Sequence, residues 1–310
     1  LNKTLGLSSA KSGELAENID VIAAKMGIGG GQARTYIQQF EQIAPLQSLN
    51  ISKQAEFAES LFTVQQALTD QLGITPEAAN ALQLYGNSLK GSVTDNIEGM
   101  YQVAMALEQQ SGLAGTARAI FQDIGSLGAD IQFQFGRVPA SLEKAVLQAR
   151  MLGTDFTTIA KAGDKVLDIE SSINDELEYQ LLSGRRLTDE SGKSLTAALR
   201  EATVRGDAAA AAEAMQEIID KEGETLKTNL FARQQMSQLL GISEDKLMRM
   251  VQQNEMLGTI GSDAMNIFNQ DTPAPANVSL LGARTGEGDT RTSEEIRAEQ
   301  TQNAILNQLL

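Results

Sequence analysis

The sequence predicts an all-α protein of many short to medium helices, joined by tight glycine corners and followed by a flexible C-terminal linker and a short terminal helix. Three observations predict this fold class: a composition that suits helices, apolar residues at helical spacing, and helix caps beside glycine turns. Aromatic residues make up only 4% of the 310 residues and Trp is absent. Ala, Leu, Ile and Gln dominate instead, and such residues suit helices with thin cores between them.

Apolar residues recur at steps of three and four, which is the spacing of one face of a helix. No stretch alternates convincingly between apolar and polar residues, as a half-buried strand would. We expect two stripes to be buried between helices: Leu61, Val64, Leu68 and Leu72 form the first, and Leu142, Ala145, Val146, Ala149 and Leu152 form the second.

Helix starts are marked by residues that satisfy the free amides of a first turn. Thr75 places a hydroxyl at the N-cap, Pro76 fits the first turn, and Glu77 places a negative charge at the positive end of the helix dipole. Ser243, with the acids Glu244 and Asp245 behind it, repeats this arrangement. The sequence thus predicts that helices begin after Thr75 and after Ser243.

Helix ends are marked by a glycine that follows an apolar residue. The clearest cases are Leu72-Gly73-Ile74-Thr75, Leu152-Gly153-Thr154-Asp155 and Leu240-Gly241-Ile242-Ser243, with Met26-Gly27-Ile28 as a weaker one. Glycine adopts the left-handed conformation that closes a helix, and the next apolar residue folds back over the last turn. The 27 glycines predict helices of about 10 to 20 residues, and their irregular spacing argues against a solenoid.

The longest predicted helix runs from Thr154 to Leu182. Gly163 is a tolerated weak point within it. Its predicted inner face comprises Ile159, Val166, Ile169, Ile173, Leu177 and Leu181.

Five regions are expected along the chain. Residues 1–111 form an N-terminal helical array, 112–139 a glycine-rich connecting region, and 140–270 a second helical domain. Residues 271–293 hold prolines, glycines and few apolar residues, which is typical of a linker. Residues 294–310 form a last helix, capped by Ser293. We expect its apolar end to dock on a partner surface through Ile305, Leu306, Leu309 and Leu310.

Composition also limits the chemistry of the chain. The absence of His and Cys removes the usual general base, the thiol nucleophile and the commonest ligands of soft metals. The net charge of −15 disfavours binding to nucleic acid and to anionic membranes, and no stretch approaches the roughly 18 apolar residues of a membrane span. We expect no enzyme activity, cofactor, metal site or membrane contact. Because the chain starts at Leu1 without an initiator Met or a signal-peptide pattern, we expect a segment of a longer or processed polypeptide.

Two glycine patterns bear on nucleotide binding. Gly29 to Gly31 precede a predicted helix whose free amides could hold a phosphate, but no strand leads into them and no acid follows at the required distance. Gly192-Lys193-Ser194 matches the end of a phosphate-binding loop, yet Leu187 stands where that motif needs glycine. A flexible turn and a solvated loop are the favoured interpretations.

Acidic residues crowd the stretch from Asp164 to Glu178. A close carboxylate pair is what glycoside hydrolysis requires, so this region is a candidate for catalysis. However, Asp164, Asp168, Asp175 and Glu178 lie largely opposite or beside the predicted apolar stripe, where charges solvate a helix. The stretch also lacks the pattern of a calcium loop. The favoured interpretation is therefore a solvated helix face.

A family resemblance emerges in the same region. Leu167 to Ile173, Asp175 to Glu178 and Leu181 to Arg185 resemble a segment of the tail tape measure proteins of tailed bacteriophages. Ala145 to Thr154 upstream resembles the preceding helix and turn. The resemblance is carried chiefly by Asp168, Glu170, Ser171, Ile173, Glu176, Leu177, Leu181 and Gly184.

Downstream pieces follow in the order expected of that family. They are Ala202 to Asp207 and Met236 to Val251, and the closest match is the corner that contains Leu240, Gly241 and Ser243. The resemblance covers residues 142–251 and extends more loosely upstream. Each piece alone is a generic helix corner, whereas several in order are more specific.

The resemblance implies a structural component of a bacteriophage tail, which sets tail length and meets the baseplate hub during assembly. An unbroken helix of this length would span at most about 465 Å, and the chain is heavily broken, so we expect the compact part of a longer tape measure protein. The implied partners are further copies of the chain, three or six in a small closed oligomer, together with hub and tail tube proteins. The implied location is the tail lumen or baseplate of the virion, after assembly in the host cytoplasm.

Two alternatives stay open. One is a helical adaptor or scaffold protein unrelated to phages. The other is a cell-wall hydrolase that uses Glu170 or Glu176, since some tape measure proteins carry such domains elsewhere. The family has no catalytic residues defined by a motif, so the resemblance implies no active site.

Overall fold

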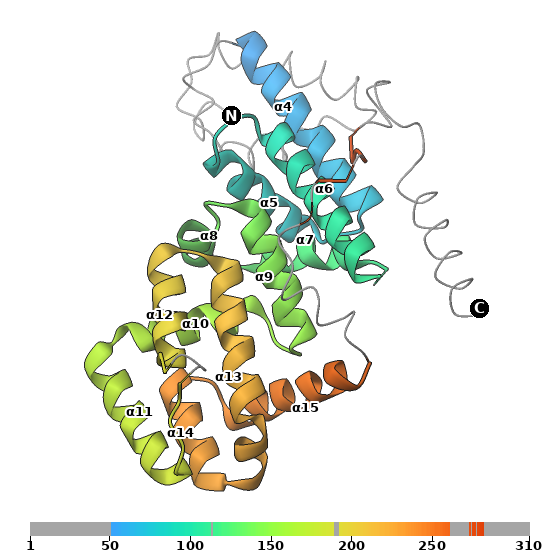
Figure 1. The fold of residues 1–310 in the computed structure, drawn as a ribbon. Coiled ribbons are helices and arrows are strands. Elements are labelled where there is room, and N and C mark those ends of the chain that lie inside the picture. The colour runs from blue at the N-terminus through green and yellow to red at the C-terminus, as the bar shows by residue number, and fades with distance from the viewer. Residues whose placement is uncertain are drawn as a thin grey trace, which may run out of the picture. The chain divides into compact units, whose positions relative to one another are not determined.

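The computed structural model describes residues 51–112, 114–188, 192–260, 273, 275–276 and 278–281. These residues form an all-α fold with twelve α-helices, α4 to α15, which confirms the predicted fold class (Figure 1). No strand occurs among them, although an isolated bridge joins Thr188 to Ser194. None of the described helices is long and apolar enough to span a bilayer.

The described residues divide into two compact units, and the boundary falls inside α6 (Val93–Ser111), after Gly99. The first unit comprises residues 51–99 and 279–281. The second comprises residues 100–112, 114–188, 192–260, 273, 275–276 and 278. The five regions predicted from the sequence stay a prediction.

The first unit contains α4 (Ile51–Gln66), which continues into a π-helical turn (Ala67–Gln71), then α5 (Pro76–Ser88) and the start of α6. Its predicted apolar stripe is buried, because each of the four side chains is at most 1% exposed. The predicted caps are also confirmed: Gly73 has a φ of +65°, and the Thr75 hydroxyl accepts a bond of 3.4 Å from the amide of Ala78.

A short piece from late in the sequence completes the first unit. Leu280 and Leu281 are buried, and their amides donate to the carboxylate of Glu98 on α6 at 3.0 to 3.2 Å. These two residues belong to the predicted linker 271–293. Within the described residues, this part of the linker is thus held against a helix.

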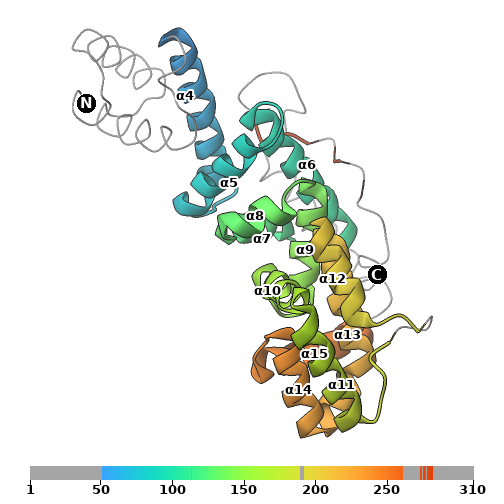
Figure 2. The ribbon, with the colours of Figure 1, turned by 90° about the vertical axis from the view of Figure 1, so that its left-hand side faces the viewer.

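The second unit continues from α6 through nine helices of the described chain: α7 (Thr116–Ser126), α8 (Ala129–Phe135), α9 (Pro139–Met151), α10 (Phe156–Leu167), α11 (Ile169–Ser183), α12 (Leu195–Arg205), α13 (Ala208–Thr228), α14 (Leu230–Leu240) and α15 (Glu244–Ile260). The long helix α13 packs against α9, α12 and α15, while α11 packs against α14 (Figure 2). The predicted stripe on α9 and the turn after it is buried, with no member more than 1% exposed.

The glycine corners of this unit are confirmed. Gly153 and Gly241 have φ values of +71° and +64°, which is the left-handed region that glycine occupies without strain. The Asp155 and Ser243 side chains then cap the helices that follow. Several expected features lie outside the described residues, namely the corner at Gly27, the turn at Gly29 to Gly31 and the docking residues Ile305, Leu306, Leu309 and Leu310.

The prediction of one helix from Thr154 to Leu182 is wrong. The helix is interrupted at Asp168. Its backbone is extended there (φ −71°, ψ 91°), and its carboxylate accepts a hydrogen bond from the amide of Ser171. Asp competes for backbone amides in this way and favours caps over helix interiors. The predicted helix is therefore two helices, α10 and α11.

Candidate interaction surface

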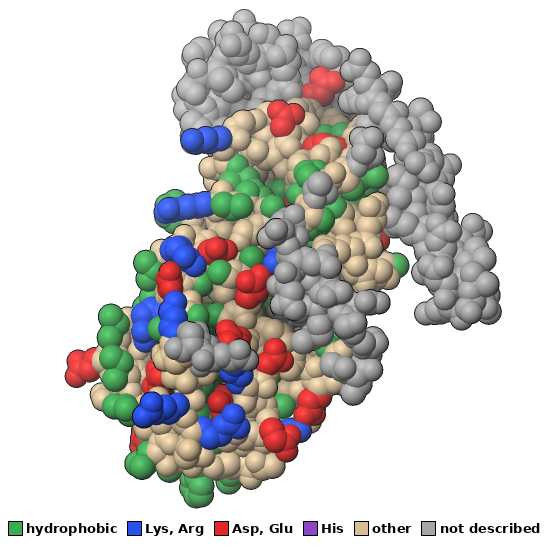
Figure 3. Space-filling view, in the orientation of Figure 1, with side chains coloured by type: hydrophobic (Ala, Val, Ile, Leu, Met, Phe, Trp, Pro, Cys, Tyr) green, Lys and Arg blue, Asp and Glu red, His purple; other side chains and the backbone are tan. Residues whose placement is uncertain are grey.

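Helix α11 exposes a row of large apolar side chains. Ile169, Ile173, Leu177 and Leu181 are 58%, 47%, 59% and 82% exposed. Residues four apart form one ridge along a helix, and we call these four the α11 stripe. Figure 3 shows hydrophobic side chains gathered along the edge of the molecule where α11 lies. Because a row of this kind is unusual on a solvated helix, it is a candidate for contact with another protein.

These four residues were expected on the inner face of the long helix, and that prediction is wrong. Of that face, Ile159 and Val166 on α10 are buried, both 0% exposed. The break at Asp168 resets the helix phase, so that the apolar ridge of α11 does not continue the buried face of α10.

The inner side of α11 is held by polar contacts. Tyr179 is 0% exposed, and its hydroxyl donates to Glu222 on α13 at 2.5 Å. Burial, together with this bond to a carboxylate, raises the pKa of Tyr179 above its ordinary value. Ser172 is the other residue of α11 that is buried. Because Tyr179 is fixed on the inner side of α11, the apolar ridge lies on the outer side of this helix.

Further contacts fix α11 to its neighbours on both sides. The carboxylate of Glu176 accepts from the hydroxyl of Thr196 at 2.7 Å and from that of Ser194 at 3.1 Å, at the start of α12. The amide of Gln235 on α14 donates to Glu178 at 3.1 Å. Gly184, with a φ of +71°, ends the helix. The α11 stripe is therefore carried on a helix that is pinned along its length.

The acids considered for hydrolysis differ in their contacts, and most of them bind groups of the protein itself. Asp168 caps α11, Glu176 accepts two hydroxyls, and Asp164 accepts from the Gln134 amide at 3.3 Å. Glu170 is exposed beside the α11 stripe. In the described part of the chain, no three acidic side chains are grouped so that they could hold a metal ion.

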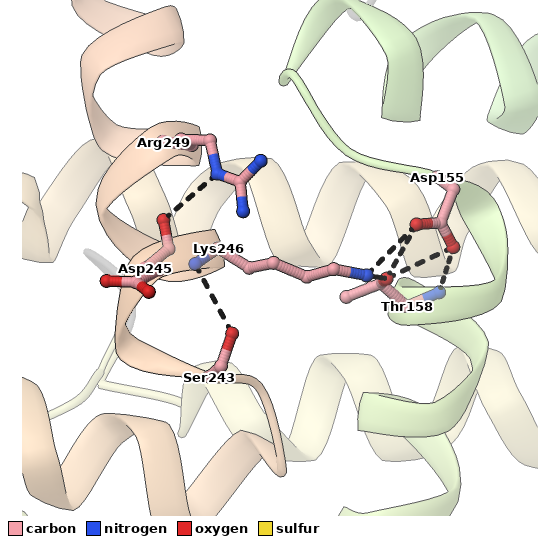
Figure 4. A network of polar contacts seen from close by, with 6 residues as sticks. All are labelled: Asp155, Thr158, Ser243, Asp245, Lys246 and Arg249. Atoms are coloured by element: carbon pink, nitrogen blue, oxygen red, sulfur yellow. Dashed lines mark hydrogen bonds and ion pairs between the residues drawn. The ribbon is translucent and has the colours of Figure 1, made fainter.

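The family-like corner at Leu240, Gly241 and Ser243 supports a polar network (Figure 4). Leu240 is buried, and the Ser243 hydroxyl accepts from the amide of Lys246 at 3.4 Å. From α15 the Lys246 ammonium reaches the first turn of α10, where it lies 3.2 Å from Asp155 Oδ2 and 2.9 Å from Thr158 Oγ1. The network joins two of the three clearest glycine corners, those at Gly153 and Gly241.

The same network sets the protonation of Asp155. Partial burial alone would raise the pKa of Asp155, but hydrogen bonds from Lys246 and Thr158 and the lysine charge outweigh it, so the pKa is lowered. Asp155 also caps α10 through a bond of 2.9 Å from the amide of Thr158. This arrangement stabilises the corner between α9 and α10.

A second exposed apolar cluster lies in the same unit. Phe133 on α8, Val138 before α9 and Val204 on α12 are 78%, 58% and 72% exposed, and we call them the α8–α12 patch. Arg137 and Arg205 are their exposed sequence neighbours. Figure 3 shows hydrophobic side chains beside Lys or Arg side chains over α8 and the adjoining end of α12. Sequence reasoning missed this patch, because its members are isolated apolar residues without periodicity.

The two sides of the α8–α12 patch are locked together by close backbone contacts. A Cβ on Gly206 would lie 2.3 Å from the carbonyl oxygen of Gln134. The Ser141 hydroxyl bonds to Asp207 at 3.1 Å and accepts from the amide of Ala209 at 3.0 Å. The turn between α8 and α9 therefore lies directly against the turn between α12 and α13.

Helix α9 buries polar side chains that sequence reasoning also missed. Glu143 and Gln148 are each 0% exposed, and neither carboxylate oxygen of Glu143 has a hydrogen-bond partner among the described residues. Burial raises the pKa of Glu143 well above its ordinary value. Lys144 beside it bonds to Glu213 at 2.8 Å. Glu143 is thus a buried acid that favours its neutral form.

Comparison with known proteins yields no relative: no protein-family model, no curated protein and no solved structure matches this chain.

Proposed function

We propose that this chain is a structural component of a bacteriophage tail, the compact part of a tape measure protein, and that it acts by packing against other proteins. The proposal has two lines of support, which meet on α11. The first is the resemblance of residues 142–251 to tape measure proteins. The second is the exposed apolar ridge on α11.

The α11 stripe is the observation that carries the proposal. The segment with the densest family resemblance, Leu167 to Arg185, includes all of α11. The same helix exposes five large apolar side chains, the four of the α11 stripe and Leu182. Each such side chain gains about 1.5 to 3 kcal/mol when it is fully buried. A contact over this ridge is therefore a strong source of assembly energy.

The surrounding structure suits assembly better than catalysis. Tyr179 and Glu176 hold α11 in place, so that little conformational entropy is lost when a partner binds. The charge of −15 also suits a tail lumen, because an acidic surface repels DNA that must pass it. The expected partners are further copies of the chain, the baseplate hub and the tail tube.

The direct test is to locate the chain in particles. An antibody raised against the purified chain is applied, with gold label, to tailed particles from cells that carry the gene, both intact and after tails are disrupted. Label on the disrupted tails or the baseplate is the expected result. A chain that stays in the host cytosol and is absent from every tailed particle would favour the adaptor alternative.

A second test asks whether the α11 stripe is needed for tails. Leu177→Glu combined with Leu181→Glu places charges in the ridge, and tails that are missing or irregular in length are expected by electron microscopy. The matched control is Met256→Glu on α15, at an apolar residue that is 50% exposed. Normal tails with the double variant would remove the α11 stripe from the proposal.

A further inference from the structure

We propose that Gly99 is a hinge between the two compact units and that a strap bound along α6 locks this hinge. The strap comprises residues 275–276 and 278–281. The inference does not depend on the proposed function, because it concerns a movement within one chain. It names the residue at which α6 bends and the contacts that keep the helix straight.

Gly99 lies where the chain passes from the first unit to the second. The boundary between the units falls directly after this residue, inside the 19-residue helix α6, and Gly99 is the only glycine of that helix. Glycine weakens a helix interior relative to alanine, because it loses more backbone freedom on folding. Residues that absorb a hinge rotation are often small. Helix α6 therefore has its weakest point at the unit boundary.

Packing does not explain this glycine. A Cβ added to Gly99 would meet nothing within 4 Å beyond the adjoining backbone of α6. Its φ is not positive, so the backbone does not require glycine either. Gly163 on α10 differs, because a Cβ there would lie 2.2 Å from the hydroxyl oxygen of Thr203. Gly163 permits close packing, whereas the effect of Gly99 is to make α6 easier to bend.

The strap bonds to α6 on both sides of Gly99, and the ribbon views show it in red beside this helix (Figures 1 and 2). Before the glycine, the carboxylate of Glu98 accepts from the amides of Leu280 and Leu281 at 3.0 to 3.2 Å. After the glycine, the carbonyl oxygen of Gln102 accepts from the amide of Ala276 at 3.0 Å. The strap is thus fixed to α6 at both of its ends.

These bonds oppose a bend of α6. Glu98 and Gln102 are four residues apart, so they lie on one face of the helix and are separated by about 6 Å along its axis. A bend at Gly99 changes this separation and strains the bonds to the strap. Helix α6 therefore stays straight while the strap is bound, and it bends at Gly99 once the strap leaves.

The strap is also the second place where the described chain passes between the units, from Val278 to Ser279. Each of its bonds to α6 lies within one unit: Ala276 and Gln102 belong to the second, and Leu280 and Glu98 to the first. The two passages between the units are therefore joined within about one turn of α6. Such a joint moves only when both passages move.

A fixed clasp without a hinge is the competing interpretation. The side chains of Leu280 and Leu281 are 0% and 7% exposed, so the strap also fills part of the core of the first unit. Burial of these leucines accounts for neither the bond from Ala276 on the other side of Gly99 nor the glycine itself. A fixed clasp predicts lower stability when its bonds are removed, but no movement at Gly99.

Distances between labels on the two units test the hinge in the full chain. Because the chain lacks cysteine, Leu84→Cys on α5 and Val204→Cys on α12 can each carry a spin label, and these positions are 37% and 72% exposed. The doubly labelled parent should give one narrow distance distribution by double electron–electron resonance. Adding Glu98→Ala removes the carboxylate that holds the strap and should broaden this distribution about twofold.

Gly99→Ala combined with Glu98→Ala separates the hinge from the clasp. Alanine stiffens α6 and meets no neighbour at this position. The distribution should therefore become narrow again, although the bonds to the strap stay lost. Equal distributions in the parent and in Glu98→Ala would overturn the lock. Broadening that Gly99→Ala does not reverse would overturn the hinge.

Asp95→Ala is the matched control, because it removes an exposed acid from the same helix. It should leave the distance distribution of the parent unchanged. A broadening equal to that of Glu98→Ala would mean that any change in α6 loosens the joint, and it would overturn the role of the strap.

Amide hydrogen exchange provides a second readout that needs no labels. Glu98→Ala should raise exchange about tenfold at the amides of Leu280 and Leu281 and in the turn of α6 that follows Gly99. Adding Gly99→Ala should restore protection in α6 alone. If Glu98→Ala melts below the working temperature, Glu98→Gln, which keeps one accepting oxygen, should show a smaller rise at the same amides. Unchanged exchange in α6 while the strap amides are exposed would overturn the inference.

Discussion

Helices α9 and α11 are similar in length but are used in opposite ways. In α9, nine of 13 residues are buried, including Glu143, Lys144 and Gln148. In α11, two of 15 residues are buried, Ser172 and Tyr179, while the apolar ridge faces solvent. One helix therefore hides polar groups and the other exposes apolar ones.

The difference shows that the position of a helix among its neighbours decides burial more than its own amphipathic pattern does. Helix α9 is contacted by α7, α10, α13 and α15, whereas α11 is contacted mainly by α14 and α10. A helix surrounded by others buries whatever it carries. A helix at an edge can keep an apolar face for a partner, provided that something else anchors it.

The largest expected effect is the difference in stability loss between a leucine truncated on α9 and one truncated on α11. Leu142→Ala on α9 removes a side chain that is 0% exposed and should lower the free energy of unfolding by about 2 to 5 kcal/mol, because it leaves a cavity. Leu181→Ala on α11, at 82% exposure, should change it by less than about 0.5 kcal/mol. Urea unfolding of both variants measures the contrast, and equal losses would contradict it.

The next effect concerns the pH dependence that Glu143 imposes. Its folded pKa is raised above the ordinary 4.5, so the folded state holds a proton that the unfolded state releases. Stability is therefore full below that ordinary pKa and falls as pH rises toward the folded pKa, by up to about 1.4 kcal/mol per pH unit. Glu143→Gln removes this dependence.

The variant should accordingly match the parent at pH 4 and be more stable at pH 8. Melting curves across this range provide the measurement. The control is Glu170→Gln on α11, which removes an exposed acid instead of a buried one. A parent whose stability does not fall between pH 5 and pH 8 would show that Glu143 ionises freely.

A smaller effect is expected where α11 is anchored. Tyr179→Phe leaves the Glu222 carboxylate, which is 2% exposed, without its bond from the tyrosine hydroxyl. The cost should be about 1 to 3 kcal/mol, because a buried polar group loses its partner. Chemical unfolding measures it. An unchanged stability for Tyr179→Phe would mean that water replaces the lost bond.

The smallest effect is expected at the start of α11. Asp168→Ala removes the side chain that bonds to the Ser171 amide and should cost about 1 kcal/mol, as the loss of an N-cap usually does. Asp168→Asn keeps a capping oxygen and serves as the matched control. Amide hydrogen exchange in residues 169–172 should rise in the first variant and not in the second. Equal exchange in both would assign the helix break to another cause.

The sequence revealed those features of the fold that depend on a few neighbouring residues. The all-α class, the caps at Thr75 and Ser243 and the glycine corners follow from local chemistry, and the structure confirms them. The stripes on α4 and α9 were also correct, because both helices have neighbours along that face. These predictions needed no knowledge of what lies across a contact.

Features that depend on distant residues were not predictable. The orientation of α11 is set by Glu222 on α13, some forty positions along the chain from Tyr179, and nothing in the local sequence announces that bond. The break at Asp168 was discernible in principle, since Asp is a common N-cap, but the apolar spacing continues through it. The burial of Glu143 follows from the helices packed around α9. The α8–α12 patch arises where two separate turns meet.

The hydrogen bonds from the amides of Leu280 and Leu281 to Glu98 affect the order in which the two units can fold during synthesis. The first unit is not finished until residues 279–281 are available, although Glu98 is made about 180 residues earlier. The second unit is thus inserted in the middle of the first, and its chain must be synthesised and leave the ribosome before the first unit is complete. Domains made in one stretch can fold as they emerge from the ribosome. The second unit can therefore fold before the first unit, which is complete only when residues 279–281 have emerged.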